Sequence, residues 1–483
     1  MTKDIKAPSL LDALIPVAML IGLLAASVTL FKDDSSYGPN QIALLLSACV
    51  AAIIAIKNGH SWLEIEKGII KGISISLGAV LILLAVGALI GTWLLAGTVP
   101  SLIYLGLKLL NPNLFYAAAC LICAIVSLSI GSSWTTAATI GVALMGVANG
   151  LGLSPAITAG AVVSGAYFGD KISPLSETTN LAPAVAGSEL FAHIRHMLWT
   201  TVPSFTLALI LFLVMGLDIH GQASSQRIDA ILTGLEGTFD ISIWHLTPLA
   251  VLLIMAVRKM PAFPAVFIGA LLGGVWALVF QQPLVAKLAG SDSLVAGLKL
   301  FWTALFNGVS IKTGNGTLDS LLSGGGMSSM LNTVWLIMCA MSFGAVMERT
   351  GLLQRLIQGL LGAVKRTGSL IAATVATCIG SNILTADQYM AIVMPGRMYK
   401  EEFERRKLAP VNLSRALEDG GTITSPLVPW NTCGAYMHSV LLVSPADYFI
   451  YAFFNLINPL LAIIYAYLGI KILKLTPPAS VRT

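Results

Sequence analysis

The chain has 483 residues, of which 56% are hydrophobic and only 11% are charged, whereas a soluble globular protein averages about 25% charged residues. This composition excludes a soluble enzyme or a soluble binding domain and predicts a polytopic membrane protein. The net charge of +5 is small and is spread over the loops, which excludes nucleic acid as a partner, because that role needs a basic patch or stripe.

The N-terminal segment and the cysteines further limit the class of protein to which the chain can belong. Lys3 and Lys6 precede an apolar run at 13–30, which is too long for the core of a signal peptide and predicts an uncleaved first membrane span. The six cysteines mostly lie inside apolar runs. The spacing Cys120-Leu-Ile-Cys123 is compatible with a redox or metal pair, but no second pair or histidine cluster accompanies it. We therefore interpret the cysteines as core residues, and we expect no cofactor.

Apolar runs long enough for membrane spans follow one another along most of the chain, since a span needs roughly 20 residues. They lie at about 13–30, 41–56, 73–97, 114–148, 155–168, 197–217, 244–257, 262–280, 330–347, 369–396, 411–443 and 446–470. Two of them carry a polar patch in the middle, at 131–136 and 380–387. Lipid cannot satisfy such patches, so they predict the tips of two re-entrant hairpins, at about 114–150 and 369–396.

The stretch around Asp170 places charges inside an otherwise apolar region. Burying Asp170, Lys171 or Glu177 at a membrane centre would cost roughly 2.5–3.5 kcal/mol per residue. Charged residues are found there mainly where their side chains line a cavity or an ion path. Pro174 disfavours a continuous helix there and frees backbone carbonyls. We therefore expect the helix at about 155–185 to be broken at a binding site.

Two short matches indicate an internal repeat. Gly131-Ser-Ser-x-x-Thr-Ala matches Gly380-Ser-Asn-x-x-Thr-Ala, and Ser173-Pro-Leu matches Ser425-Pro-Leu at nearly the same offset. Both matches fall at polar breaks in apolar segments, so a second broken helix is expected at about 411–443. Paired broken helices in corresponding positions of two halves are typical of transporters built from inverted repeats.

The expected fold is thus an all-α polytopic membrane protein with an inverted-topology repeat, two re-entrant hairpins and two broken helices. The first repeat is expected at 1–217, an external linker at 218–243 and the second repeat at 244–483, with an external insertion at 282–327.

Lys and Arg are unevenly distributed between the loops. We assume that the N-terminus is cytoplasmic and that both hairpins return to the side they entered. The cytoplasmic segments, which include the turn 258–259, then hold 20 of the 28 Lys and Arg, and the external segments hold six. Positive residues concentrate on the cytoplasmic side of membrane proteins, so the sequence predicts that both termini are cytoplasmic.

At two places a hairpin tip is expected to meet a broken helix and to form a cage of oxygen atoms. Hydroxyls, amides, free carbonyls and carboxylates bind hard cations, whereas soft metals prefer thiolate or imidazole. Ser and Thr also hydrogen-bond back to their own helix, which is the competing explanation for any single hydroxyl. The two sets together favour cation binding. The first set is Ser132, Ser133, Thr135, Asp170, Ser173, Thr178, Thr179 and Asn180, and the second is Ser381, Asn382, Thr385, Asp387, Thr424, Ser425, Asn431 and Thr432.

The chain resembles the NhaC-type sodium/proton antiporters of the ion transporter superfamily in four strings. They are G-S-S-W-T-T-A-A-T-I-G (131–141), S-G-A-Y-F-G-D-K-I-S-P-L-S-E-T-T-N-L-A-P (164–183), L-T-A-D-Q-Y (384–389) and S-P-L-V-P-W-N-T-C-G (425–434). The resemblance covers nearly the whole chain. It implies a bacterial inner-membrane protein that exchanges Na⁺, with Li⁺ as an alternative ion, for H⁺. It also implies a homodimer and an elevator-like movement of a transport domain against a scaffold.

In such an exchange Na⁺ and H⁺ would compete for a buried carboxylate. Asp387 has no adjacent cation in the sequence and is the first choice as proton carrier. Lys171 is expected to neutralise Asp170, which would then stay ionised as the Na⁺ ligand. Further candidates for the proton carrier are Asp170, Glu177, Glu418 and Asp419, although local pairing with Arg415 is a competing explanation for the last two.

Two other interpretations stay open. The matched strings lie around the ion site, so they do not separate Na⁺/H⁺ exchange from sodium- or proton-coupled exchange of carboxylates such as malate and lactate. Asn382 and Asn431 could donate to an organic anion, but neither set contains a membrane-embedded arginine. An intramembrane aspartyl protease would use Asp170, in Phe168-Gly-Asp170, together with Asp387, but it would give the hydroxyl sets and the repeat no role. We therefore expect a transporter and not an enzyme.

Overall fold

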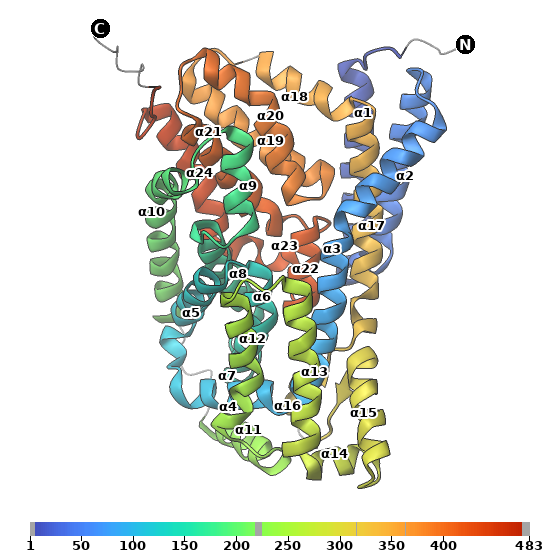
Figure 1. Ribbon diagram of the computed structural model, residues 1–483, viewed down its shortest axis with the longest axis vertical. Helices are drawn as coiled ribbons and strands as arrows, with labels where there is room; N and C mark the ends of the chain where they lie inside the picture. The colour runs from blue at the N-terminus through green and yellow to red at the C-terminus, as the bar shows by residue number, and fades with distance from the viewer. Residues whose placement is uncertain (1–4, 218–224, 315, 363, 476–483) are drawn as a thin grey trace.

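Helices form almost the whole molecule, and most of them run along its long axis (Figure 1). The computed structural model describes residues 5–217, 225–314, 316–362 and 364–475. Lys3 and residues 218–224 of the expected linker lie outside the described residues.

The first part of the chain is helical from its tenth residue. Its elements are α1 (Leu10–Phe31), η1 (Lys32–Tyr37), α2 (Pro39–Lys57), α3 (Trp62–Leu95), α4 (Thr98–Leu109), η2 (Pro112–Leu114), α5 (Phe115–Ile130), α6 (Ser133–Thr136), η3 (Ala137–Gly141), α7 (Val142–Leu151), α8 (Pro155–Ile172), α9 (Glu177–Ala186), α10 (Leu190–Leu217) and α11 (Ser225–Thr238).

The second part contains the two short strands and the remaining helices. Its elements are η4 (Ile243–Leu246), α12 (Thr247–Val257), α13 (Ala262–Phe280), α14 (Gln282–Ala289), α15 (Leu294–Asn307), β1 (Val309–Ser310), α16 (Gly316–Leu321), β2 (Ser323–Gly324), η5 (Met327–Met330), α17 (Leu331–Arg349), α18 (Leu352–Gly362), α19 (Thr367–Thr385), α20 (Gln388–Arg405), α21 (Pro410–Leu417), η6 (Glu418–Thr422), η7 (Ser425–Leu427), α22 (Thr432–Leu441), α23 (Pro445–Tyr448), η8 (Phe449–Tyr451) and α24 (Phe453–Leu468).

The described residues contain nine helices that are long and apolar enough to cross a membrane, or up to eleven if each bent pair counts as one span. Among them, strands amount to one antiparallel pair, in which Val309 faces Gly324 and Ser310 faces Ser323. The expected class, an all-α polytopic membrane protein, is confirmed. The inverted relation of the two halves stays a prediction.

In the first hairpin and the first broken helix, the helices are interrupted at the polar residues. Gly131 ends α5 with φ +76°, and the Ser132 hydroxyl accepts a hydrogen bond from the Thr135 amide at the start of α6. A Cβ on Gly131 would lie 2.6 Å from the Leu175 Cβ, so a glycine is required at this close approach. The chain breaks again after α8, and the Ser176 hydroxyl caps α9.

The second pair of breaks lies at the end of the polar patch and at Ser425–Leu427 of η7. Residues 380–385 of the polar patch stay helical at the end of α19, and the break comes at Ala386, a left-handed residue with φ +57°. Asp387 then caps α20 by accepting a hydrogen bond from the Met390 amide at 3.0 Å. The Thr432 amide donates to the Ala386 carbonyl at 2.8 Å, which holds the start of α22 against this break.

Some elements are longer than hydropathy alone predicts. α3 begins at Trp62 instead of 73, because Ser61 and Glu64 form a capping box that starts the helix in a charged segment. The expected external linker contains α11, whose Ile231 and Leu235 are buried where α11 packs on α4 and α7. The expected external insertion contains α14 to α16 and the strand pair.

The helices form two groups that lie side by side in Figure 1. The right-hand group consists of α1, α2, α3, α13 and α17, with α3 packed against both α13 and α17. The left-hand group consists of α5, α8, α10, α19 and α24, with α8 packed against α5 and α24 against both α10 and α19. α12 and α13 occupy the lower half of the view, so the turn between them lies near mid-height.

We expect Gly165→Ala to destabilise the protein, because α5 and α8 pack closely at this position. A Cβ on Gly165 would lie 2.0 Å from the Cys120 carbonyl oxygen, and overpacking of this kind costs about 1–3 kcal/mol. Thermal unfolding in detergent would measure the loss. Gly22→Ala in α1 is the matched control, because a Cβ added there would meet no neighbouring group of the described residues within 4 Å. An equal effect of both changes would contradict the close packing.

Candidate ion-binding site

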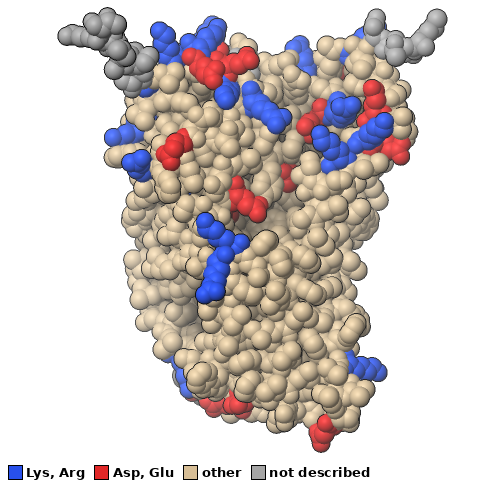
Figure 2. Space-filling model, viewed as in Figure 1, with Lys and Arg blue, Asp and Glu red and all other residues tan. Residues whose placement is uncertain are grey.

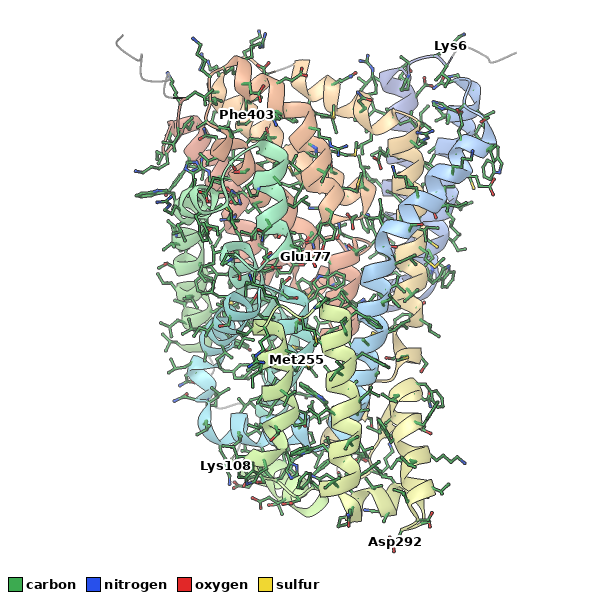
Figure 3. All side chains as sticks on the ribbon, in the orientation of Figure 1. Lys6, Lys108, Glu177, Met255, Asp292 and Phe403 are labelled. Carbon is green, nitrogen blue, oxygen red and sulfur yellow. The ribbon has the colours of Figure 1, made fainter. Side chains whose placement is uncertain are left out.

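A cavity of about 650 Å³ lies where the two groups of helices face each other. One wall comes from α3 and the α12–α13 turn, and the other from the α5–α6 hairpin tip, the α8–α9 break and the α19–α20 break. Figure 3 places Glu177, which lines the cavity, about halfway along the molecule. At this height Figure 2 shows acidic and basic side chains meeting in a hollow, on a surface that is otherwise almost uncharged between two charged ends.

The hairpin tip is fastened to the end of α8 by a hydrogen bond between predicted ligands. The Ser133 hydroxyl donates to the Asp170 carboxylate at 2.6 Å, and both residues are buried. The Thr135 hydroxyl donates to the Ser132 hydroxyl at 3.1 Å. Ser132, Ser133, Thr135 and Asp170 all line the cavity. The first expected set is therefore partly assembled around one carboxylate.

The other members of the first set divide into cavity-lining and structural residues. Thr178 and Asn180 line the cavity. The Ser173 hydroxyl donates to the Leu128 carbonyl, and the Thr179 hydroxyl donates to the carbonyls of Asp170 and Lys171 at 3.0 and 2.8 Å. Ser173 and Thr179 thus satisfy backbone carbonyls at the ends of α5 and α8 that have no partner in their own helix.

Most of the second set forms a buried network behind the cavity. The Asn382 amide donates to the Gly421 carbonyl at 2.6 Å and to the Thr424 hydroxyl at 3.1 Å, and the Asn431 amide donates to the Asn382 side-chain oxygen at 3.1 Å. The members that do not line the cavity are Ser381, Asn382, Thr385, Thr424, Ser425 and Asn431. Asp387 and Thr432 do line it. The two expected sets therefore meet at a shared cavity.

The carboxylates of Asp170, Glu177 and Asp387 line this one cavity. Asp170 and Asp387 keep only 7% and 3% of their surface exposed. The Tyr389 hydroxyl donates to the Glu177 carboxylate and so joins the α9 start to α20. Neither Asp170 nor Asp387 has an ion-pair partner among the described residues. Carboxylates with hydroxyls and amides around them are ligands for a hard cation.

Lys171 does not neutralise Asp170 as the sequence suggested. Its ammonium group forms a fully buried ion pair with Asp419 of η6. The pairing of Glu418 and Asp419 with Arg415 is likewise wrong, because the Arg415 guanidinium donates to the Lys471 carbonyl instead. Adjacent side chains on a helix point in different directions, so Asp170 faces the cavity while Lys171 faces the interior.

Several cavity residues were missed from the sequence. Ser176, Gln388 and Tyr389 lie inside the strings that carry the resemblance, so their position next to the breaks was an available signal. Lys259 also lines the cavity, although its turn was assigned to a cytoplasmic loop. Nothing in the local sequence marks Lys259, because only the packing of α12 and α13 carries that turn to the middle of the molecule.

The helices and the cavity between their two groups place the protein among multi-pass membrane transporters. A model of the Na⁺/H⁺ antiporter family matches residues 165–470. The chain is 39% identical to the Na(+)/H(+) antiporter NhaC of Alkalihalophilus pseudofirmus, covering 94% of this chain and 96% of that protein. The protein belongs to the Na⁺/H⁺ antiporter family.

Other relatives have names that point to different substrates. The chain is 36% identical to the Malate-2H(+)/Na(+)-lactate antiporter of Bacillus subtilis, covering 97% of this chain and 96% of that protein. It is 35% identical to the Arginine/ornithine antiporter ArcD of Halobacterium salinarum, covering 98% of this chain and 95% of that protein. The expected family is confirmed.

Proposed function

We propose that the protein is a secondary antiporter that exchanges Na⁺, or Li⁺ in its place, for H⁺ across the bacterial inner membrane. The observation that carries this proposal is the convergence of Asp170, Glu177 and Asp387 on one cavity, together with the hydroxyls of the hairpin tip and the helix breaks. A site of this kind can bind a hard cation or protons at the same oxygen atoms. The names of the NhaC relatives support the same exchange.

The proposal assigns different roles to the two buried aspartates. Asp170 binds Na⁺ together with Ser133, whose hydroxyl already lies 2.6 Å from the carboxylate. Asp387 carries the proton, because it has no paired cation among the described residues and reaches the same cavity. Na⁺ and H⁺ then exclude each other at neighbouring carboxylates. An aspartyl protease has less support, because Asp170 bonds to Ser133 and Asp387 to the Met390 amide instead of to each other.

We infer the larger arrangement from the family and the repeat. Residues 1–217 and 244–483 would be inverted halves, each with one hairpin and one broken helix around the cavity. The right-hand group of helices would serve as scaffold and the left-hand group would move with the bound ion, as in an elevator. A homodimer would hold the scaffolds in the bilayer.

The proposed orientation can be tested with single cysteines, because Asp229 and Glu404 are both exposed. A membrane-impermeant thiol reagent should label Asp229→Cys in α11 from outside the cell, and it should label Glu404→Cys in α20 only after permeabilisation. The background should be Cys49→Ser, because Cys49 is exposed and the other five cysteines are buried. The reverse labelling pattern would overturn cytoplasmic termini.

A second candidate function is coupled exchange of a small carboxylate, such as the malate and lactate named for one relative. The cavity of about 650 Å³ is many times the roughly 30 Å³ that one water occupies in the liquid. Lys259 lines it and has no ion-pair partner in the described ranges. A lysine in this position would attract an anion and repel Na⁺, which is the specific observation that favours this candidate.

Transport by purified protein in vesicles separates the two candidates. With an acidic interior and a pH-sensitive dye, NaCl alone should dissipate the gradient if Na⁺ and H⁺ compete for one site. An exchanger of carboxylates should give no response until malate, lactate or a similar anion is present, and Lys259→Gln should then weaken the apparent affinity for that anion. A response that requires the anion would overturn Na⁺/H⁺ exchange as the function.

A further inference from the structure

A second cluster of charged residues lies behind the cavity, on the interior side of α8. Lys171 and Asp419 form an ion pair in which both side chains are fully buried. The Lys171 ammonium also donates to the Asn458 side-chain oxygen at 2.8 Å, and the Thr200 hydroxyl donates to Asp419 at 3.2 Å. The charge of Asp419 is therefore matched by a cation and a hydrogen bond, as a buried carboxylate requires.

Glu418, the neighbour of Asp419, forms no such ion pair among the described residues. It is fully buried, and neither of its carboxylate oxygens has a hydrogen-bond partner among the described residues. The Thr422 hydroxyl, one turn further along, is buried and acts on Glu418 as a hydrogen-bonding group, although the two side chains form no close hydrogen bond in the described residues. Burying an isolated ionised carboxylate costs much free energy, and burying a protonated carboxyl group costs far less. Lys171 acts in the opposite direction, since a nearby cation favours an ionised carboxylate.

The helices packed most closely against η6 are α8, α9, α19, α20, α21 and α24. Asp170 and Lys171 reach it from α8, and Lys171, Asp170 and Asp419 are the charges that act on Glu418. The titratable groups of other elements that act on the cluster are His193 on α10, Cys378 on α19 and Arg415 on α21, and Tyr465 on α24 acts on Arg415. With the Glu418 proton bound, the group of Lys171, Arg415, Glu418 and Asp419 carries one net positive charge.

The end of α8 joins this cluster to the cavity. Asp170 faces the cavity and the next residue, Lys171, faces Asp419. The Thr179 hydroxyl bridges the backbone carbonyls of both residues, so the two side chains are held on one rigid segment. A cation that binds at Asp170 adds a positive charge beside a cluster that already has one. Loss of a proton from the cluster would restore the balance of charge.

We propose that Glu418 is a second proton-exchanging group, outside the cavity, and that Lys171 is the positioning residue that couples it to the ion at Asp170. When Na⁺ binds at Asp170, the O–H bond of the Glu418 carboxyl breaks and its proton passes to water that reaches the cavity. The resulting carboxylate is stabilised by Lys171, and the total charge of site and cluster does not change. This inference rests on the proposed Na⁺/H⁺ exchange.

Infrared difference spectroscopy on the purified full-length protein tests the inference without transport. Wild type should show a protonated-carboxyl band that disappears when NaCl is added or when the pH is raised. Glu418→Gln should lack this band, and ¹³C-labelled glutamate should shift it in wild type. Glu418→Asp should restore a titrating band, because it keeps an ionisable group. Glutamine has nearly the shape of glutamic acid and breaks no described hydrogen bond, so the fold should be retained.

The dye assay in vesicles supplies the second measurement. Sodium-driven proton movement should be lost in Glu418→Gln, should persist in Glu418→Asp, and should be unchanged in Glu404→Gln, whose carboxylate is exposed on α20. An unchanged infrared band and unchanged transport in Glu418→Gln would overturn the inference. If wild type fails to respond to NaCl, the proposed exchange fails. The pH-dependent band of wild type then still decides whether Glu418 exchanges a proton.

Discussion

Asp170→Asn and Asp387→Asn should each abolish exchange while leaving a folded protein. At position 170, asparagine keeps one oxygen that can accept the Ser133 hydrogen bond, and at position 387 it remains a good helix cap for α20. Neither asparagine can ionise. Removing one partner of a buried charge pairing costs about 3–5 kcal/mol, so Na⁺ affinity should fall by more than about 100-fold in Asp170→Asn.

The two substitutions should differ in detail. Asp387→Asn should bind Na⁺ but should not complete the exchange, because the cavity can no longer take up a proton in place of Na⁺. Sodium-dependent thermal stabilisation of the purified protein would show the binding, and the dye assay would show the coupling. Asp292→Asn, in the exposed segment between α14 and α15, is the control and should transport normally. Normal coupling of Na⁺ to H⁺ in Asp387→Asn would show that the proton carrier lies elsewhere.

Apparent Na⁺ affinity should weaken steeply as the external pH falls. Na⁺ bound at Asp170 and a proton bound at Asp387 exclude each other in the shared cavity, so the bound ion is displaced once the pH drops below the value at which Asp387 takes up a proton. In the ideal competitive limit each further pH unit weakens the apparent Na⁺ affinity about tenfold, or 1.36 kcal/mol. The maximal rate at saturating Na⁺ should change much less, since excess Na⁺ overcomes a competitor.

Initial rates of dye response over a series of NaCl concentrations at several pH values would measure this effect. Above the titration range the Na⁺ affinity should become independent of pH, because the carboxylates are then already free of protons. A constant Na⁺ affinity across the whole range, with only the maximal rate changing, would contradict competition at one site. It would indicate instead that protons act at a group outside the shared cavity.

The sequence predicted the helix breaks well because local rules control them. Gly131 and Ser132, for example, combine a left-handed residue with a helix cap, and both are readable without a structure. In the second hairpin the break falls at the end of the expected patch, since the chain after Gly380 stays helical until Ala386. There the hydrogen bonds of Asn382 and Asn431 satisfy the polar groups inside a packed interior, so no loop is needed to expose them.

Hydropathy and spacing by themselves determined the membrane class, the approximate spans, the positions of the main breaks and the two aspartates that line the cavity. The tertiary structure decided which of the polar residues share that cavity. It paired Lys171 with Asp419, which is 248 residues away, left Glu418 without a partner among the described residues, and brought Lys259 to the cavity wall. Such contacts exist only after helices that are distant in the sequence have packed together. The sequence pattern shows which face of a helix is apolar, but it does not show which other helix packs against that face.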